Sequence, residues 1–520
     1  MVWLKIIKLL MLQTIRTSHP RVYKHFSALE DGEKYVQQII DIDAYWERVQ
    51  GQSVEQVVVD GGSPAMMQDV DGEFDIICAG GTLGLLHASV MASVHGFRVL
   101  VFDRYAVGKA TRDWNISREE LDSLEKVGLF TSDQVDACIV SRYKTGWAEF
   151  SVSEDRRKRL YLDNVLDCAL EADLLLGLAL DKVTASPGCM VAHRMTFTRV
   201  HRYRDCVIVE VLDSEKVTRR YRARVFIDAM GITSPVAMQL NDGRPQTHVC
   251  PTVGTIASGL EGVDHEVGEI LVSTEPADMS SGRGRQLIWE GFPAGRDRYI
   301  TYLFFYDEID SPNDKSLLGL FESYFEKLPG YKMPGRDFMV ERPVFGIIPA
   351  YWHDGFSLSR RIADDRILML GDAATLNSPL TFCGFGSFIR NISRLTGGLA
   401  SVLREGRLDR SSLEQVSAYE PNVAAMANLM KYMCYDSTTD DPNFVNELMN
   451  EVMVVLDSLP PRYREAMFKD RMQLGELMAV GLNVAVRYPD VLRVTFEKLG
   501  FGGTIGMMKN LLGWAVSPVR

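Results

Sequence analysis

Six consecutive residues have the types and the spacing of a phosphate-binding turn. They are Ala79, Gly80, Gly81, Thr82, Leu83 and Gly84. The turn follows an apolar segment and precedes a helical pattern, as the G-x-G-x-x-G turn of a dinucleotide-binding fold does. Gly81 would let the backbone approach a pyrophosphate, and Gly84 would let the helix lie close to the strand. Ala79 replaces the first glycine of the motif, so the turn alone is a weak signal.

An acidic residue follows at the distance that such a fold requires. Asp103 ends the next apolar strand pattern, about twenty residues after the glycines, where a carboxylate binds ribose hydroxyls. Arg104, directly after it, is a further candidate for contact with the cofactor. The competing interpretation is an ordinary loop at the end of a strand. The succession of strand, turn, helix, strand and acid favours the dinucleotide-binding fold.

Two later segments carry glycine where a flavoprotein needs it. Gly371 and Asp372 end an apolar strand pattern, and a late strand ends in Gly-Asp in flavoproteins with two dinucleotide-binding folds. There the aspartate lies on the ribityl and phosphate side of FAD. The next helix opens on Gly384, Phe385 and Gly386 and would point its N-terminus at a flavin ring.

A third apolar strand pattern, 226–231, ends at Gly231, which would lie beside the same cofactor. The order and spacing of these segments predict FAD rather than NAD. The sequence contains no G-x-S-x-G, no H-E-x-x-H and no phosphate-binding loop with its lysine, so the corresponding hydrolase, metalloprotease and nucleotidase chemistries are not predicted.

The overall composition excludes several other classes of protein. Hydrophobic residues make up 46% and charged residues 24% of the chain, which is typical of globular proteins. The net charge of −12 argues against a nucleic-acid partner, because phosphates need a basic surface. Eight cysteines without a C-x-x-C pair predict neither a metal site nor a disulfide framework. No apolar stretch is long and uninterrupted enough to cross a bilayer.

Apolar periodicity predicts the elements that position these motifs. Strands are expected at 74–79, 98–103, 190–199, 206–212, 218–229 and 367–372, and a hairpin at 286–294 and 299–307. Helices are expected from the glycine turn to about 94, at 117–127, at 160–172 and from 384 onward. The sequence from 411 to the end is helical in pattern and rich in methionine.

These elements predict an α/β protein, a Rossmann-type FAD-binding fold with an inserted β-sheet substrate lobe and a C-terminal helical cap. The expected organisation is an N-terminal extension at 1–70, a discontinuous FAD-binding domain at 71–235 and 340–405, a β-rich substrate lobe at 236–339, and a Met-rich helical region at 406–520. Residues 1–29 are basic and contain no acid. They fit an organelle transit peptide, a mobile basic arm or an incorrect start site.

Several short segments also match the pattern of a known family. They are the glycine turn 80–84, Trp-Asn-Ile-Ser-Arg at 114–118, Ile-Asp-Ala-Met-Gly at 227–231 with Ser-Pro at 234–235, Trp-Glu-Gly-Phe-Pro-Ala at 289–294, Gly-Asp-Ala-Ala at 371–374, Ser-Pro-Leu-Thr-Phe at 378–382, Gly-Phe-Gly-Ser at 384–387, and Asp-Pro-Asn-Phe-Val-Asn at 441–446. On these residues the chain resembles the CruA/CruP-type lycopene cyclases, the CruP-like proteins most closely, from about residue 45 to near the C-terminus.

The resemblance implies FAD as cofactor, with NAD(P)H as a source of electrons, and places Arg112, Asn115 and Ser117 near it. The implied substrate is a carotenoid or another isoprenoid hydrocarbon. The implied reaction is an isomerisation in carotenoid metabolism: a proton adds to an acyclic end, a ring closes and a proton leaves, without net redox. The implied location is a plastid, at the thylakoid, or the cytoplasmic face of a photosynthetic membrane. Peripheral attachment through the apolar tail is expected.

Glu290 is the candidate proton donor. It lies in a strand pattern of apolar and aromatic residues, where burial would raise its pKa and keep it neutral. The competing interpretation is a hairpin glutamate paired with Arg285, Arg296 or Arg298. The better-known branches of the resembled cyclases carry two glutamates in a related place, and this chain has one.

Two apolar regions have two interpretations each. An aromatic strand could line a tunnel for a polyene or belong to the core: Tyr299, Tyr302, Phe304, Phe305 and Tyr306. The Met-rich tail could form an adaptable groove, face a bilayer or pack as core.

Two other functions are open on the same sequence. The first is an FAD-dependent isoprenoid reductase or monooxygenase, which substrate-dependent oxidation of NAD(P)H would distinguish from an isomerase. The second is a non-catalytic carotenoid- or prenyl-binding regulator, which Ala79 and the single Glu290 leave open. The sequence does not define the oligomeric state.

Overall fold

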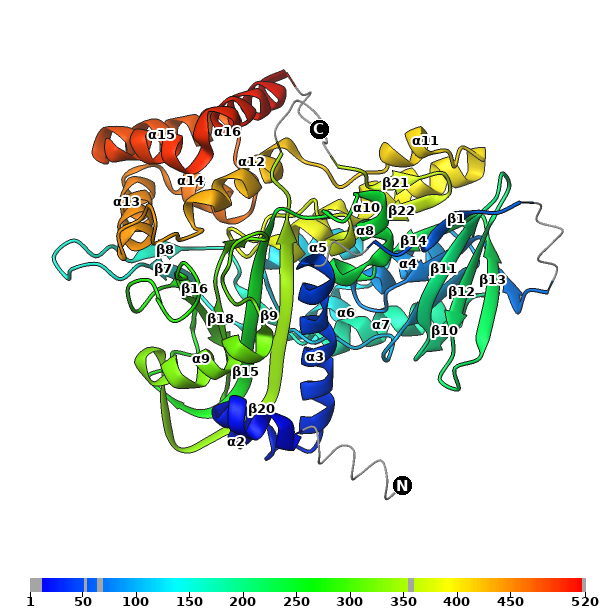
Figure 1. Cartoon of the computed structure of the whole chain (residues 1–520), viewed down its shortest axis with the longest axis horizontal. Helices are drawn as coiled ribbons and strands as arrows, with labels where there is room; N and C mark the ends of the chain where they lie inside the picture. The colour runs from blue at the N-terminus through cyan, green and yellow to red at the C-terminus, as the bar shows by residue number, and fades with distance from the viewer. Residues whose placement is uncertain (1–11, 51–53, 63–68, 354–359, 517–520) are drawn as a thin grey trace.

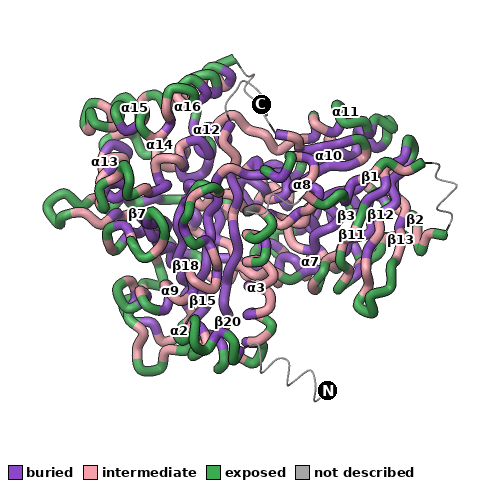
Figure 2. Tube along the Cα trace, viewed as in Figure 1, coloured by how far each residue is buried: buried purple, intermediate pink, exposed green. Residues whose placement is uncertain are grey.

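The computed structural model describes residues 12–50, 54–62, 69–353 and 360–516. Within these ranges a parallel sheet with its helices stands beside a large, mostly antiparallel sheet, and the C-terminal helices cover one end of the large sheet (Figure 1). Buried residues run continuously from one sheet into the other (Figure 2).

The parallel sheet has six strands in the order β10-β4-β3-β14-β22-β21, and only β21 is antiparallel to its neighbour. The strands are β3 (Ile76–Ala79), β4 (Val99–Asp103), β10 (Met190–His193), β14 (Val225–Asp228), β21 (Ala363–Asp364) and β22 (Ile367–Met369). The helices packed on or beside it are α4 (Leu83–Ser93), α7 (Ala172–Ala185) and α10 (Gly384–Glu405). Because the strands run in parallel, their carboxyl ends meet at one edge of the sheet.

Two smaller sheets flank the parallel one. The first has the order β1-β11-β12-β13-β2, with β1 (Val58–Asp60), β2 (Gly72–Glu73), β11 (Thr196–Arg202), β12 (Val207–Leu212) and β13 (Thr218–Ala223). The second has the order β5-β9-β6, with β5 (Trp114–Ile116), β6 (Ile139–Arg142) and β9 (Cys168–Leu170). The segments 190–199 and 218–229, each expected as one strand, therefore contribute to two strands each.

The large sheet has the order β19-β15-β18-β17-β16-β7-β8, and β20 pairs with β15. Its strands are β7 (Thr145–Glu149), β8 (Leu160–Leu162), β15 (His248–Glu261), β16 (Val267–Val272), β17 (Ile288–Pro293), β18 (Arg298–Phe304), β19 (Asp307–Glu308) and β20 (Met333–Ala350). The expected hairpin is confirmed as β17 and β18, which place Glu290 opposite Tyr302. The sheet draws on segments from both sides of the expected boundaries at 235 and 340.

The helix expected at 160–172 is wrong. The segment forms β8 and β9, and α7 begins only at Ala172. Leu160 and Leu162 are buried while Tyr161 between them is half exposed, which is the alternation of a strand. Asn164 and Leu166 then adopt positive φ angles of 58° and 48°, a conformation that ends any helix.

The N-terminal extension is packed against the large sheet. Helices α2 (Pro20–Phe26) and α3 (Gly32–Gln50) contact α9 (Leu317–Tyr331). Asp43 accepts hydrogen bonds from the first two backbone N–H groups of α9, and Phe26 is fully buried. The segment expected as a transit peptide is thus packed from residue 12 on, and residues 1–11 lie outside the described residues.

The remaining helices are α5 (Arg118–Lys126), α6 (Ser132–Ala137), α8 (Pro235–Leu240), α11 (Arg410–Glu414), α12 (Pro421–Leu429), α13 (Phe444–Ser458), α14 (Pro461–Phe468), α15 (Leu474–Arg487) and α16 (Asp490–Val516).

The expected helical tail is confirmed. Met426, Met430, Met433 and Met453 belong to the core between this tail and the large sheet. The aromatic strand is also buried on both of its faces. Among the described residues, no helix is both long and apolar enough to span a bilayer.

Candidate cofactor site and the buried glutamate

A cavity of about 1170 Å³ lies at the carboxyl edge of the parallel sheet. Doubly wound sheets bind their ligands at this edge. The predicted site residues that line it are Gly80, Gly81, Thr82, Leu83, Gly84, Asp103, Arg104, Arg112, Gly231, Gly371 and Asp372. Segments separated by nearly three hundred residues of sequence therefore meet around one space, as the predicted cofactor requires.

The glycines of the turn are required by close backbone contacts. A Cβ on Gly80 would lie 2.1 Å from the carbonyl oxygen of Ala229, and the φ angle of Gly80 is +124°. A Cβ on Gly81 would lie 2.8 Å from the Cα of Val107. On Gly84 it would lie 2.7 Å from the Cβ of Ala229. No side chain fits at these positions. The N–H groups of Gly80 and Gly81 donate to Phe102 and Asp103, so a phosphate would meet the amides that follow, at the start of α4.

Ala79, which departs from the motif, does not line the cavity. It is the last residue of β3, is fully buried, and lies between Phe102 and Asp228 of the neighbouring strands. A methyl group fits in this strand position, while the positive φ angle falls on Gly80. The replacement therefore leaves the turn intact.

Asp103 holds the turn through its carboxylate. One oxygen accepts the N–H of Gly81 at 2.8 Å, and the other accepts the N–H of Tyr105 at 2.8 Å. Each carboxylate oxygen has a second lone pair, so both can still accept ribose hydroxyls.

Asp372 and Arg112 face each other across the cavity wall, with 3.6 Å between Oδ2 and Nη2. Burial raises the pKa of Asp372, and the guanidinium of Arg112 opposes that rise. Arg112 lies over β20, where the missing side chain of Gly346 leaves room for it. The pair adds one cation and one acid to the wall of the cavity.

The sequence did not predict two parts of the cavity wall, because neither contains a cofactor-binding motif. Several residues of α3 line the cavity, and the Oη of Tyr105 donates to Asp41 of this helix at 2.7 Å. The loop between β12 and β13 contributes Asp213 and Lys216. Neither segment has a spacing that signals cofactor binding, and both reach the cavity only through the tertiary fold.

Gly384, Phe385 and Gly386 do not line this cavity, although Phe388 of the same helix does. Phe385 stacks on Trp114, with ring centroids 4.2 Å apart, and it is Trp114 that lines the cavity. The missing side chain of Gly386 makes room for the carboxylate of Glu120, which pairs with Arg390. Gly384 and its two successors therefore lie behind the wall, and their contact with a flavin stays a prediction.

Glu290 is buried, with 3% of its surface exposed. Burial raises its pKa to about 8, and the hydrogen bond from the Nδ2 of Asn115, at 3.4 Å, opposes the rise. Two of the arginines that could have paired with it are paired elsewhere, Arg285 with Asp278 and Arg298 with Glu341. At neutral pH the carboxyl group is therefore protonated.

Glu290 ends a short chain of hydrogen bonds that lies next to the strand bordering the cofactor cavity. The Oη of Tyr143 donates to the Oδ1 of Asn115, whose amide donates to Glu290. Asn115 directly follows Trp114 of the cavity wall. Tyr302, opposite Glu290 in the sheet, donates to the carbonyl oxygen of Asp113 at 3.0 Å. In β5, Trp114 thus lines the cavity, and the next residue, Asn115, contacts the buried acid.

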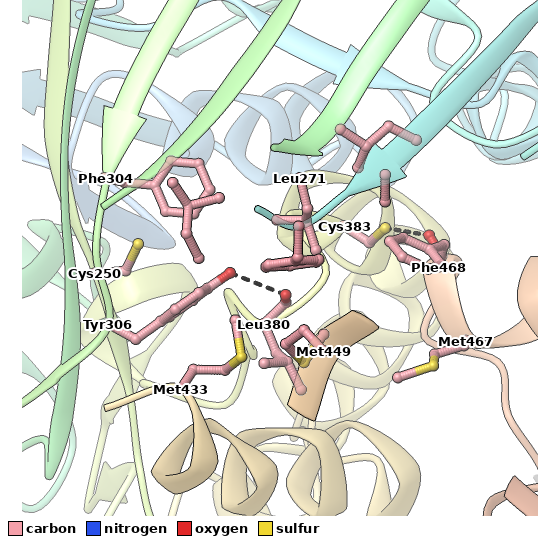
Figure 3. Packing of buried hydrophobic residues seen from close by; sticks show 14 of the residues in the cluster. Cys250, Leu271, Phe304, Tyr306, Leu380, Cys383, Met433, Met449, Met467 and Phe468 are labelled. Carbon is pink, nitrogen blue, oxygen red and sulfur yellow. Dashed lines mark hydrogen bonds between the residues drawn. The ribbon is translucent and has the colours of Figure 1, made fainter. Parts of the chain in front are cut away.

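The apolar core continues beyond Glu290 into the helical cap (Figure 3). Phe304 and Tyr306 lie next to Leu380 and Met433, and the Oη of Tyr306 donates to the carbonyl oxygen of Leu380 at 2.9 Å. The buried acid therefore belongs to a core made of aromatic rings and methionine side chains.

Comparison with known proteins shows which fold this is. No family model matches the chain, and no curated protein matches it. A geranylgeranyl bacteriochlorophyll reductase-like protein from Thermoplasma acidophilum is similar in structure, with a TM-score of 0.58 and 14% identity over 82% of this chain and 99% of that one. Halogenase PltM in complex with phloroglucinol and FAD has a TM-score of 0.55 and 12% identity over 85% and 96% of the two chains.

A third similar structure is p-nitrophenol 4-monooxygenase PnpA from Pseudomonas putida DLL-E4, with a TM-score of 0.53 and 14% identity over 77% of this chain and 99% of that one. The predicted fold is confirmed: the chain has the Rossmann-type fold of FAD-binding flavoproteins, with a C-terminal helical region. The resemblance to lycopene cyclases stays a prediction.

Proposed function

We propose that this chain is an FAD-dependent isomerase that closes a ring at the end of an acyclic carotene or related isoprenoid hydrocarbon. The observation that carries the proposal is the placement of Glu290, a buried carboxylic acid that accepts a hydrogen bond from Asn115, the residue next to Trp114 of the cavity wall. Burial raises the pKa of this acid to about 8, which favours its neutral form. A neutral acid beside a flavin site is what a proton-initiated cyclisation needs. The resemblance to lycopene cyclases names the substrate class and the location at a photosynthetic membrane.

The residues of the cavity fit FAD. The amides at the start of α4 would bind the pyrophosphate, Asp103 can bind ribose hydroxyls, and Arg112 with Asp372 adds a cation and an acid on the same wall. Halogenase PltM, of the same fold, was crystallised with FAD. Bound FAD in its reduced form would supply a negative charge that stabilises a carbocation.

The proton step uses the chain's own residues. The carboxyl group of Glu290 gives its proton to the terminal double bond, and the carbocation closes the ring by forming a carbon–carbon bond. A neighbouring carbon then loses a proton, which the carboxylate takes back, so no oxidant or reductant is consumed. Asn115 stabilises the transient carboxylate by its hydrogen bond, and the ring faces of Tyr302 and Tyr306 stabilise the cation.

Access to Glu290 requires the apolar core to open toward the cap. Met430 and Met433 come from the cap and contact the same core as Glu290's strand. Unbranched methionine side chains change rotamer at low cost, so they can make room for a long hydrocarbon.

An FAD-dependent isoprenoid reductase is the second candidate. One observation favours it: the similar structures carry the names of a reductase-like protein and a monooxygenase, which are redox enzymes. Such an enzyme would oxidise NAD(P)H in proportion to substrate, and the isomerase would not.

The deciding experiment is pigment analysis of a lycopene-accumulating bacterial host that expresses the chain. The wild type should produce cyclic carotenes. Glu290→Gln, which keeps size but has no proton to give, should lower the yield by at least about a hundredfold while flavin content is unchanged. Glu341→Gln, a partly exposed glutamate of the same sheet, is the control and should be active. Reduced product instead of cyclic product would favour the reductase.

A further inference from the structure

Exposed apolar side chains gather on the last two helices. More than half of the large apolar residues exposed in the described part of the chain lie on α15 and α16. They are Met478, Leu482, Val486, Leu492, Phe496, Phe501, Ile505, Met508, Leu512 and Val516. Val486 is 82% and Phe501 is 72% exposed. The two helices form the outer edge of the helical cap, away from both sheets (Figure 1).

The second half of α16 has an inverted arrangement of residue sizes. A non-helical Gly500 separates it from the first half. Beyond this break the buried positions are the small residues Gly506, Asn510 and Gly513, and the exposed ones include Phe501, Ile505, Met508 and Leu512. A helix on a water-facing surface has its large apolar residues inside and polar residues outside. The small residues inside bring this helix close to its neighbours and leave its large apolar residues pointing outward.

The charges of this segment also differ from those of the whole chain. The net charge is −12, yet no acid occurs after Glu497, and the only charged residues that follow are Lys498, Lys509 and Arg520. On α15 the only acid is Glu476, in the first turn. Lys498 forms an ion pair with Asp440, and Arg520 lies outside the described residues. In the described part of α16 beyond Gly500, the outward apolar face therefore has one lysine, Lys509, and no acid, a combination that suits phosphate-bearing headgroups.

We propose that α15 and α16 dock the protein on a lipid bilayer, with both helices lying in the plane of the interface. Large apolar residues outward, small residues inward and a flanking lysine are the arrangement of a helix that lies at the boundary of headgroups and acyl chains. The attachment is mainly apolar. It does not depend on which reaction the FAD site performs.

Co-sedimentation with vesicles tests the docking. The wild type should sediment with phosphatidylcholine vesicles and more strongly with vesicles that also contain phosphatidylglycerol, and high salt should not release it. The triple variant Phe501→Glu, Met508→Glu and Leu512→Glu should lower the partition coefficient by at least about a hundredfold, because each side chain contributes roughly tenfold or more when buried in apolar surroundings.

A matched control uses three exposed methionines outside the two helices. They are Met279, Met333 and Met339, each more than half exposed. Their combined change to glutamate should leave binding within about twofold of the wild type, because these positions lie outside the docking face. Thermal unfolding of both triple variants should match the wild type, since all six side chains face solvent.

Three outcomes would overturn the proposal. The wild type could stay in the supernatant with both kinds of vesicle. The α16 variant could bind as strongly as the wild type. Finally, sedimentation equilibrium without lipid could show a dimer that the α16 variant loses, together with no vesicle binding, which would assign this face to a second copy of the chain.

Discussion

The glycine turn of the cofactor cavity and the surroundings of Glu290 lie on either side of β5, and they are built in different ways. In the turn, backbone atoms are in contact: a single added carbon on Gly80 would meet a carbonyl oxygen at 2.1 Å. Around Glu290, side chains from separate segments are in contact: Asn115 from β5, Tyr302 from β18 and Tyr143 from the connection between β6 and β7. A site made of backbone depends mainly on where glycine occurs in the sequence. A site made of side chains depends on the whole fold.

The turn should be far less tolerant of change than the buried acid. Gly80→Ala adds a Cβ that collides with Ala229 at a φ angle of +124°. Steric overlap and backbone strain together should cost about 4 kcal/mol or more, enough to prevent accumulation of folded protein. Soluble yield and chemical unfolding measure this cost.

Gly177→Ala is the matched control, because nothing lies within 4 Å of a Cβ there and the residue is inside α7. It should stabilise the protein by about 0.4–1 kcal/mol. Equal stability of the two alanine variants would show that the turn is not held by backbone contacts.

Glu290→Gln should stabilise the protein, and more so as the pH rises. The folded pKa of about 8 exceeds the ordinary value of 4.5, so the unfolded chain loses this proton at lower pH than the folded one. Wild-type stability therefore falls between about pH 4.5 and pH 8, and the glutamine variant lacks this loss. The difference in unfolding free energy should grow by roughly 4 kcal/mol over this range. Urea unfolding at several pH values measures it.

Other buried acids do not affect the difference in unfolding free energy between wild type and Glu290→Gln. Asp43 and Asp470 also have pKa values raised to about 7 by burial, but both are present in wild type and variant and cancel in the difference. A difference that does not change with pH would mean that Glu290 is ionised in the folded protein, which would remove the basis of the proposed proton step. Cyclisation by the wild type should also decline as the pH passes about 8.

Much of the fold could be predicted because local patterns determine it. The turn residues Gly80 to Gly84, the strand that ends at Asp103 and the Gly371–Asp372 pair meet at one cavity, as their order along the chain indicates. Such motifs predict structure in unrelated sequences because their residue types determine the backbone conformation. The hairpin of β17 and β18 was equally predictable, since two alternating apolar segments flank one short turn.

The errors and omissions have physical causes. At 160–172 the apolar residues fit a helix as well as two strands, and the positive φ angles of Asn164 and Leu166 decide against the helix. The wall that α3 contributes could not be predicted, because residues 31–42 reach the cavity only by packing on the large sheet. The contact of Gly386 with Glu120 could not be predicted either, because no local pattern reveals it, and the expected approach of Gly386 to a flavin stays a prediction.

Two aspartates at the cavity should separate its two roles, turn stability and cofactor binding. Asp103→Ala leaves the N–H groups of Gly81 and Tyr105 without their acceptor and should cost about 1–3 kcal/mol of stability. Asp372→Ala removes an acid whose burial is itself unfavourable, which offsets the lost contact with Arg112, so stability should change by less than about 1 kcal/mol. Both should weaken FAD binding. Thermal unfolding of the apoproteins and flavin titration measure the two effects. A larger loss of apoprotein stability in Asp372→Ala would contradict this assignment.

The variant with the smallest expected effect, Tyr105→Phe, tests whether a single side-chain contact contributes to retention of the cofactor as the turn does. The hydroxyl of Tyr105 donates to Asp41 at 2.7 Å and ties α3 to the wall beside Asp103. Tyr105→Phe removes only this bond, so the unfolding free energy should fall by about 1 kcal/mol. Because α3 lines the cavity, loosening it should raise the dissociation rate of FAD by about fivefold, the factor that corresponds to this energy. Stopped-flow release of flavin fluorescence measures the rate, and Tyr161→Phe, at a half-exposed tyrosine of the large sheet, is the control. An unchanged rate in Tyr105→Phe, together with the expected loss of stability, would mean that α3 covers the cavity without holding what binds there.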